Sequence, residues 1–166
     1  MKLELASKYC IELGDEPAKF ISNFAVFTWQ VSHVWCVRDH VDNSQCVEQF
    51  VAKVFRCNPF SSSYVSERDW ESRVDLPTWL LSLDVEKVDQ NYLSRIISMA
   101  RADLKLSEDE PEVIKEVLAT MNSIKTPLHG WKIKETFDRR CPVGPTEIIL
   151  FEADSSYFFL EIHNES

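Results

Sequence analysis

The spacing of apolar residues changes along this chain, and each spacing predicts a different element. Apolar residues alternate with polar ones between Leu3 and Leu13, which predicts one or two short N-terminal strands ending at Gly14. Asp15-Glu16-Pro17 has the side-chain acceptor, the carboxylate and the proline that are typical of a helix start. Residues 3–17 therefore predict one or two strands, a turn and the beginning of a helix.

Residues 20–37 fit two periods. A helical period of three and four joins Phe20, Phe24, Phe27 and Val31, whereas alternation joins Phe27 to every second residue as far as Val37. The β-branched and aromatic content favours a strand, and the length and the preceding start signal favour a helix. We interpret the segment as a deeply buried helix, with the strand as the alternative.

The next segments have helical spacing interrupted by a loop. Apolar residues three and four apart predict a helix from Val47 to Phe55 that ends before Asn58-Pro59. We expect a polar loop over residues 58–66, a short helix over residues 66–74, and a turn or helix that starts on Pro77.

Two helices are predicted in the second half. Asp84 is positioned to cap the first, whose apolar residues recur at three and four as far as Leu104. Ser107 begins a capping box before the second, which runs to Ile124. Because only Lys105-Leu106 separates them, we expect an antiparallel helical hairpin.

Beyond Gly130 the period becomes two, which predicts a strand from Trp131 to Phe137. Two further strands, Glu147 to Ala153 and Tyr157 to His163, are apolar at successive positions, so each should be covered on both faces or lie centrally in the sheet. Strands, then helices, then strands indicate an α+β fold in which a C-terminal antiparallel sheet packs on the helices.

The length of the chain and its cysteines limit the class of protein to which it can belong. A chain of 166 residues with ten Phe, five Trp and four Tyr predicts one folded domain over residues 1–166. Its five cysteines include no Cys-x-x-Cys pair, which does not suit a disulfide framework. Residues 1–8 contain no apolar stretch of signal-peptide length, and no window is apolar enough to span a membrane, so we expect a reducing cytoplasm.

The charge is acidic and uneven. The net charge is −9, with −3 on residues 1–83 and −6 on residues 84–166. A field of this sign repels phosphate backbones, and no basic stripe offsets it, so nucleic-acid binding is disfavoured. Only three glycines are present, which excludes a Gly-rich phosphate loop, and we expect no cofactor.

The sequence contains two candidate chemical sites. On a helix, His33, Cys36 and His40 would share one face and could bind Zn²⁺ with Cys46, but on a strand His33 and Cys36 point apart. The spacing matches no established zinc signature, and we assign no metal ligand. Cys141, which follows two arginines, is the best candidate for a reactive thiol, with a histidine such as His129 as its partner; we assign no catalytic residue.

A partner-binding site has clearer candidates. Glu108, Asp109, Glu110 and Glu112 stand at a predicted helix start, where they stabilise the helix dipole and also offer an acidic patch to a basic partner. Trp70 is the tryptophan enclosed by charged neighbours, so it anchors either a short helix or a partner.

In size, in charge and in the absence of catalytic motifs, the chain resembles the small acidic bacterial immunity or inhibitor proteins that neutralise a cationic toxin. The resemblance implies a non-enzymatic, cytoplasmic protein that binds a basic partner such as a nuclease toxin. A small thiol-dependent enzyme and a metal-binding domain are the alternatives.

Overall fold

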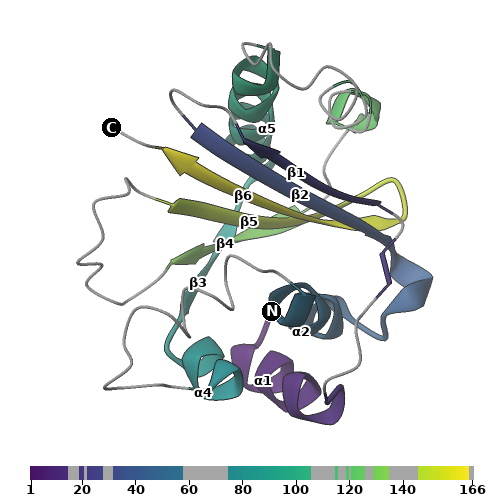
Figure 1. The fold of residues 1–166 in the computed structure, drawn as a ribbon, viewed down its shortest axis with the longest axis vertical. Coiled ribbons are helices and arrows are strands. Elements are labelled where there is room, and N and C mark those ends of the chain that lie inside the picture. Colours follow the sequence, from purple (N-terminus) through teal and green to yellow (C-terminus); the bar gives the residue numbers. More distant parts are fainter. Residues whose placement is uncertain are drawn as a thin grey trace.

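A computed structural model describes residues 1–14, 19–20, 22–27, 32–57, 75–105, 115, 119, 121–125, 129–134 and 146–164. Within these ranges the chain forms one antiparallel sheet with helices on both of its faces (Figure 1). The α+β class predicted from the sequence is confirmed.

The sheet has six antiparallel strands in the order β1-β2-β6-β5-β4-β3. They are β1 (Ser22–Phe27), β2 (Ser32–His40), β3 (Asp84–Val88), β4 (His129–Lys134), β5 (Thr146–Ala153) and β6 (Ser156–Asn164). The two N-terminal strands therefore extend the C-terminal sheet, with β2 paired directly to β6. In this order β1 and β3 are the two edges.

Helices α1 (Leu3–Glu12), α2 (Val47–Cys57) and α4 (Leu76–Leu81) lie on one face of the sheet, and α5 (Gln90–Lys105) lies on the other (Figure 1). A short 3-10 helix, η1 (Val41–Asn43), connects β2 to α2. In the described ranges, no helix combines the length and the apolar character that crossing a membrane would require.

The helices predicted at Val47–Phe55 and on Pro77 are confirmed as α2 and α4. Asp75 caps α4 by accepting a hydrogen bond from the Thr78 backbone N–H at 2.9 Å, and Pro77 lies in the first turn, where its missing N–H costs nothing. The predicted loop at residues 58–66 and the helix at residues 66–74 lie outside the described residues.

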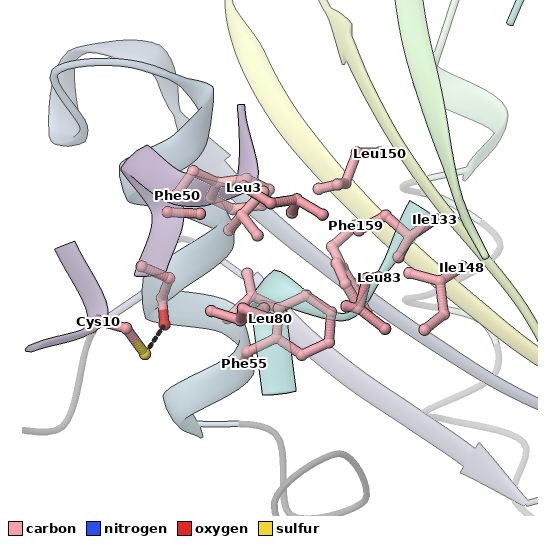
Figure 2. Packing of buried hydrophobic residues seen from close by; sticks show 14 of the residues in the cluster. Leu3, Cys10, Phe50, Phe55, Leu80, Leu83, Ile133, Ile148, Leu150 and Phe159 are labelled. Atoms are coloured by element: carbon pink, nitrogen blue, oxygen red, sulfur yellow. Dashed lines mark hydrogen bonds between the residues drawn. The ribbon is translucent and has the colours of Figure 1, made fainter. Parts of the chain in front are cut away.

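The core between the sheet and the α1-α2-α4 layer combines aliphatic side chains with several aromatic rings (Figure 2). The Phe55 ring meets the Trp79 ring edge to face at 5.2 Å between centroids and the Phe159 ring at 5.4 Å. Phe55 and Phe159 are fully buried. Aromatic pairs of this geometry add to the stabilisation from burial alone, so α2, α4 and β6 are held to one another here.

The opposite face has its own core beneath α5. Phe151 and Phe158 from neighbouring strands stack at 4.9 Å with an interplanar angle of 3°, and both are buried. Gly130 of β4 faces this layer, and a Cβ added there would lie 2.6 Å from the Leu150 backbone oxygen and 2.9 Å from a methyl carbon of Leu93. Glycine is required because a side chain here would collide with the backbone of β5 and with Leu93 of α5.

The two central strands therefore bury alternate side chains on opposite faces, which explains their unbroken apolar runs. This two-sided burial and the positions of β5 and β6 within the sheet confirm the predictions for residues 147–163. Asp154 and Ser155 form the connecting turn with φ of 48° and 57°, the left-handed region that a two-residue hairpin turn of the favoured twist uses. The predicted strand from Trp131 to Phe137 is confirmed as β4 where it is described.

Three sequence predictions were wrong, beginning with the N-terminal strands. Residues 3–12 form helix α1, and its buried residues, Leu3, Ala6, Ser7 and Cys10, have helical spacing. The alternation seen in the sequence included Ile11, which is 65% exposed. Small residues formed the buried stripe, and a pattern based on large apolar residues missed it.

The helix chosen for residues 20–37 was also wrong. Residues 22–27 and 32–40 form the antiparallel pair β1–β2, so the strand alternative was correct. The β-branched and aromatic content was the better guide, because β2 lies between two strands and tolerates apolar residues at successive positions.

The helix predicted to start at Asp84 begins six residues later. Residues 84–88 form the edge strand β3, and α5 starts at Gln90, capped by Asp89, which accepts a hydrogen bond from the Tyr92 backbone N–H at 2.7 Å. Val85 and Val88 extended the helical spacing by coincidence, since each packs on a different core.

The helical hairpin is described only in part. Lys115, Ala119 and Met121–Ser123 are helical, and the connection at residues 106–114 lies outside the described residues. Arg101 Nε donates to the Met121 backbone oxygen at 3.1 Å. In a tightly connected antiparallel pair Arg101 would face the beginning of the second helix, so this contact with its end does not fit that register.

Candidate functional site

Four polar or ionisable side chains form a row across neighbouring strands, on the face that carries α1 and α2. The strand register pairs Asp39 with Tyr157, Tyr157 with Glu152, and Glu152 with His129. Residues directly opposite one another in antiparallel strands point to the same face, with Cβ atoms about 5 Å apart. The row therefore crosses β2, β6, β5 and β4 at the end of the sheet where β5 turns into β6.

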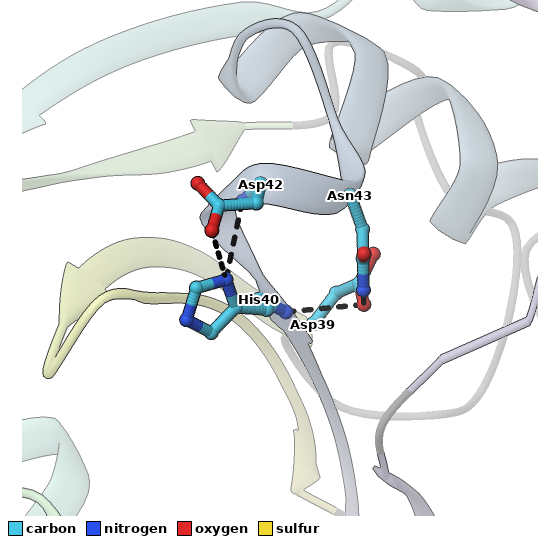
Figure 3. Close-up of polar contacts among 4 residues, drawn as sticks. All are labelled: Asp39, His40, Asp42 and Asn43. Atoms are coloured by element: carbon cyan, nitrogen blue, oxygen red, sulfur yellow. Dashed lines mark hydrogen bonds and ion pairs between the residues drawn. The ribbon is translucent and has the colours of Figure 1, made fainter.

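Asp39 is the buried member of the row, with none of its surface exposed. Its Oδ1 accepts hydrogen bonds from the His40 backbone N–H at 3.1 Å and from Asn43 Nδ2 at 2.7 Å (Figure 3). Its Oδ2 is also buried and has no hydrogen-bond partner. The carboxylate thus ties the end of β2 to η1 and retains one unused acceptor, which is rare among buried polar atoms.

His40 and Asp42 form a second contact beside it (Figure 3). His40 Nδ1 accepts from the Asp42 backbone N–H at 3.3 Å and lies 3.2 Å from Asp42 Oδ2. Only an Nδ1 without a hydrogen can accept from the N–H, and only an Nδ1–H can donate to the carboxylate, so the nitrogen makes one of these two hydrogen bonds at a time.

Helix α2 contributes Glu48 in its first turn. Burial opposes ionisation of Glu48, but the Lys2 backbone N–H donates to its Oε1 at 2.9 Å, and the pKa of the carboxyl is lowered. Glu48 is therefore anionic at neutral pH, at a helix start where the helix dipole favours negative charge.

Two tyrosines lie among these carboxylates. Burial, followed by the charge of Glu152 and weaker effects of Cys46 and Glu48, raises the pKa of Tyr157. A hydrogen bond to Cys46 is the largest of the effects that raise the pKa of Tyr9. Both phenols stay neutral at physiological pH and can donate or accept hydrogen bonds.

At the outer end of the row a partly exposed histidine contacts a glutamate. His129 Nε2 lies 3.4 Å from Glu152 Oε2, with the side chains 43% and 26% exposed, and the imidazole meets the Trp131 ring edge to face at 5.2 Å. His129 therefore contacts both a carboxylate and an indole.

The turn between β5 and β6 joins the same region. The Val41 backbone N–H donates to the Ser155 backbone oxygen at 3.0 Å, which fastens this turn to η1. We call the group Asp39, Asp42, Glu48, Glu152 and Asp154 the acidic end. Lys53 lies beside it, with its ammonium donating to the backbone oxygen of Asn43 and, at 3.0 Å, to Ser44 Oγ.

The residues assigned from sequence to partner binding, Glu108, Asp109, Glu110, Glu112 and Trp70, lie outside the described residues, as does Cys141. They stay predictions. The acidic end was missed because its members come from distant segments. One signal was available: a two-residue turn at Asp154-Ser155 fixes the pairing of Glu152 with Tyr157.

The proposed zinc arrangement depended on the helix that the structure replaces with β2. Residues 33–40 are strand rather than helix, and Cys36 is buried beneath α5. Among the residues that the structure describes, no three histidine, cysteine or acidic side chains are grouped to hold a metal ion.

Of the three cysteines whose side chains are described, Cys10 and Cys36 are buried and Cys46 is partly exposed. Burial raises the pKa of the Cys36 thiol to about 12, against a smaller opposing effect of Arg38. Burial also raises the pKa of Cys10. These two thiols are core residues rather than nucleophiles.

Because of Cys36, the stability of the fold should decrease at alkaline pH. The thiol has a pKa of 9.0 in the unfolded chain and about 12 in the folded one, so the unfolded chain loses this proton first. The contribution of the neutral thiol to stability is therefore complete below pH 9 and is lost as the pH rises toward 12. We expect the free energy of unfolding to fall by about 1.4 kcal/mol between pH 7 and pH 10 through this group. Urea unfolding of the wild type and of Cys36→Ala at both values measures it, because other titrating groups are common to the two proteins. An identical pH dependence in both would contradict the assignment.

No protein-family model, curated protein or solved structure matches this chain. We therefore infer its function from its own residues.

Proposed function

We propose that the chain is a non-enzymatic protein-binding module whose acidic end binds a basic protein. The observation that supports the proposal is that Glu48 of α2 and Glu152 of β5 both act electrostatically on the partly buried Tyr157, at the end of the sheet where the β5–β6 turn is hydrogen-bonded to η1. Clustered carboxylates attract cationic partners and fix their orientation, and tyrosine is enriched at binding hot spots. A cytoplasmic inhibitor that neutralises a cationic toxin is the form of this function that the sequence favours.

The geometry suits arginine better than a diffuse positive surface. Arginine offers five N–H donors in a planar fork that binds carboxylates in pairs. The charges of Glu152 and Glu48 both raise the pKa of Tyr157, so both carboxylates lie within electrostatic reach of one phenol group. Phe50 stacks on one face of this ring, at 5.4 Å between centroids. An arginine beside the phenol could donate to either carboxylate and stack on the other face.

Removing charge from the acidic end should weaken capture of the partner. We expect Glu48→Gln with Glu152→Gln to reduce affinity at least tenfold, roughly 1.4 kcal/mol, because two charge-assisted contacts are lost. The measurement is capture of basic proteins from a lysate of the source cells on the immobilised chain, followed by titration of the captured protein.

The matched control removes the same charge from the opposite edge of the sheet, by Asp84→Asn with Glu86→Gln in β3. Glu86 pairs with Lys134 at the surface, where such a pair contributes little to stability. Equal losses of capture in both double variants would show that only total charge matters and would remove the acidic end as the site.

A further inference from the structure

The two edges of the sheet differ in charge. Edge strand β3 contains Asp84, Glu86 and Lys87, all exposed, and Glu86 pairs with Lys134 of β4. Charged side chains on an edge strand oppose pairing with another chain, because a second strand would bury or confront them. The β3 edge is therefore protected by its own residues.

Edge strand β1 has no such protection. From Phe20 to Val37 the sequence contains no Asp, Glu, Lys, Arg or Pro, although the chain as a whole carries a net charge of −9. In the described part of the chain, β1 pairs with β2 on one side and with no strand on the other. Every second residue of an antiparallel strand directs its backbone N–H and C=O away from its partner, so β1 offers a row of hydrogen-bonding groups.

We propose that two copies of this chain associate through β1, paired antiparallel about a two-fold axis so that the two sheets become one. An antiparallel pair of identical strands is complementary to itself, which a two-fold interface requires. The absence of charged residues makes β1 the edge at which two acidic copies can pair. Two chains of net charge −9 repel each other, and an uncharged strand lets their backbones meet without opposing like charges.

The same pairing at β3 is disfavoured. Two-fold pairing centred on that strand would place Glu86 directly opposite its own copy, and like charges directly opposite in a sheet are destabilising. The sheet therefore grows at one edge and stops at the other, which gives a closed dimer rather than a filament.

This association is independent of the proposed binding of a basic partner, and salt distinguishes the two. Salt screens the repulsion between two acidic copies, so it should tighten the dimer. The same screening should weaken the attraction between the acidic end and a basic protein. Failure of one proposal leaves the other testable.

Analytical ultracentrifugation over a range of protein and salt concentrations tests the proposal. We expect the mass to rise from one chain to two, at lower protein concentration in higher salt. Hydrogen exchange should show amides of β1 becoming protected as the protein concentration rises, while amides of β3 do not change. A mass of one chain at every concentration would overturn the proposal.

Ser22→Lys and Asn23→Lys place one positive charge on β1, on opposite faces of the sheet. Pairing centred on β1 would place residue 22 opposite residue 27 of the other copy and residue 23 opposite residue 26, so either lysine would put a charge beside an apolar residue in the seam. We therefore expect either variant to raise the dissociation constant at least tenfold. Glu86→Gln changes the net charge by the same amount on the other edge and should leave the dimer intact. Circular dichroism identifies a variant that fails to fold. A dimer that persists in both folded lysine variants would place the interface elsewhere and overturn the proposal.

Discussion

Replacing either Phe158 or Phe159 with alanine is expected to destabilise the protein by about 3–5 kcal/mol. These neighbours in β6 point to opposite faces, yet both are buried. Phe158 stacks on Phe151 beneath α5, and Phe159 meets the edge of Phe55 beneath α2. Truncation leaves a cavity in either core, because the surrounding side chains relax only in part.

Urea unfolding monitored by circular dichroism measures both losses. Leu81→Ala is the matched control, since Leu81 is an apolar residue of α4 that is 53% exposed, and its truncation should change stability by less than about 1 kcal/mol. A sheet covered on one face only would leave one of the two phenylalanines in water. A small loss for Phe158→Ala with a large loss for Phe159→Ala would therefore contradict the two-sided arrangement.

Asp39→Ala is expected to cost about 2–4 kcal/mol, because it leaves two donors at the end of β2 without their acceptor. One donor is the His40 backbone N–H, and the other is Asn43 Nδ2. Asp39→Asn should cost less than half as much, since an amide oxygen can replace Oδ1 and the buried negative charge disappears. Thermal or urea unfolding of the two variants at pH 7 measures the difference.

Asn43→Ala is the companion variant. It removes one of the two donors and leaves the other, so a loss of about 1 kcal/mol is expected. Equal losses for Asp39→Asn and Asp39→Ala would show that the charge itself, and not the acceptor, holds η1 on β2. That outcome would also give the unpartnered Oδ2 a role in stability.

The sequence predicted best where one period continued without a competing signal. Strands β5 and β6 and helix α2 were predicted correctly, because their apolar residues admit one interpretation and turn residues bound them. Helix α1 was missed because Ala6, Ser7 and Cys10 form its buried stripe, and small residues give a weak apolar signal. The pair β1–β2 was missed because β2 lies inside the sheet, where the alternation between polar and apolar faces disappears.

The acidic end was harder to predict for a different reason. Its carboxylates occur at positions 39, 42, 48, 152 and 154, so pairing of β2 with β6 is needed to bring them together. The uneven charge of the sequence directed attention to residues 108–112 instead. Once β2 is known to be a strand next to β6, the register places Asp39 opposite Tyr157 and the group follows.

The salt dependence of partner affinity tests the central claim most directly. The captured basic protein is titrated with the wild type, with Glu48→Gln/Glu152→Gln and with Asp84→Asn/Glu86→Gln, by calorimetry from low to high ionic strength. The acidic end predicts that affinity of the wild type and of the β3 variant falls at least tenfold with added salt, and that the Glu48/Glu152 variant starts weaker and falls less. Affinity that does not change with salt, or that changes equally in all three proteins, would contradict binding at the acidic end.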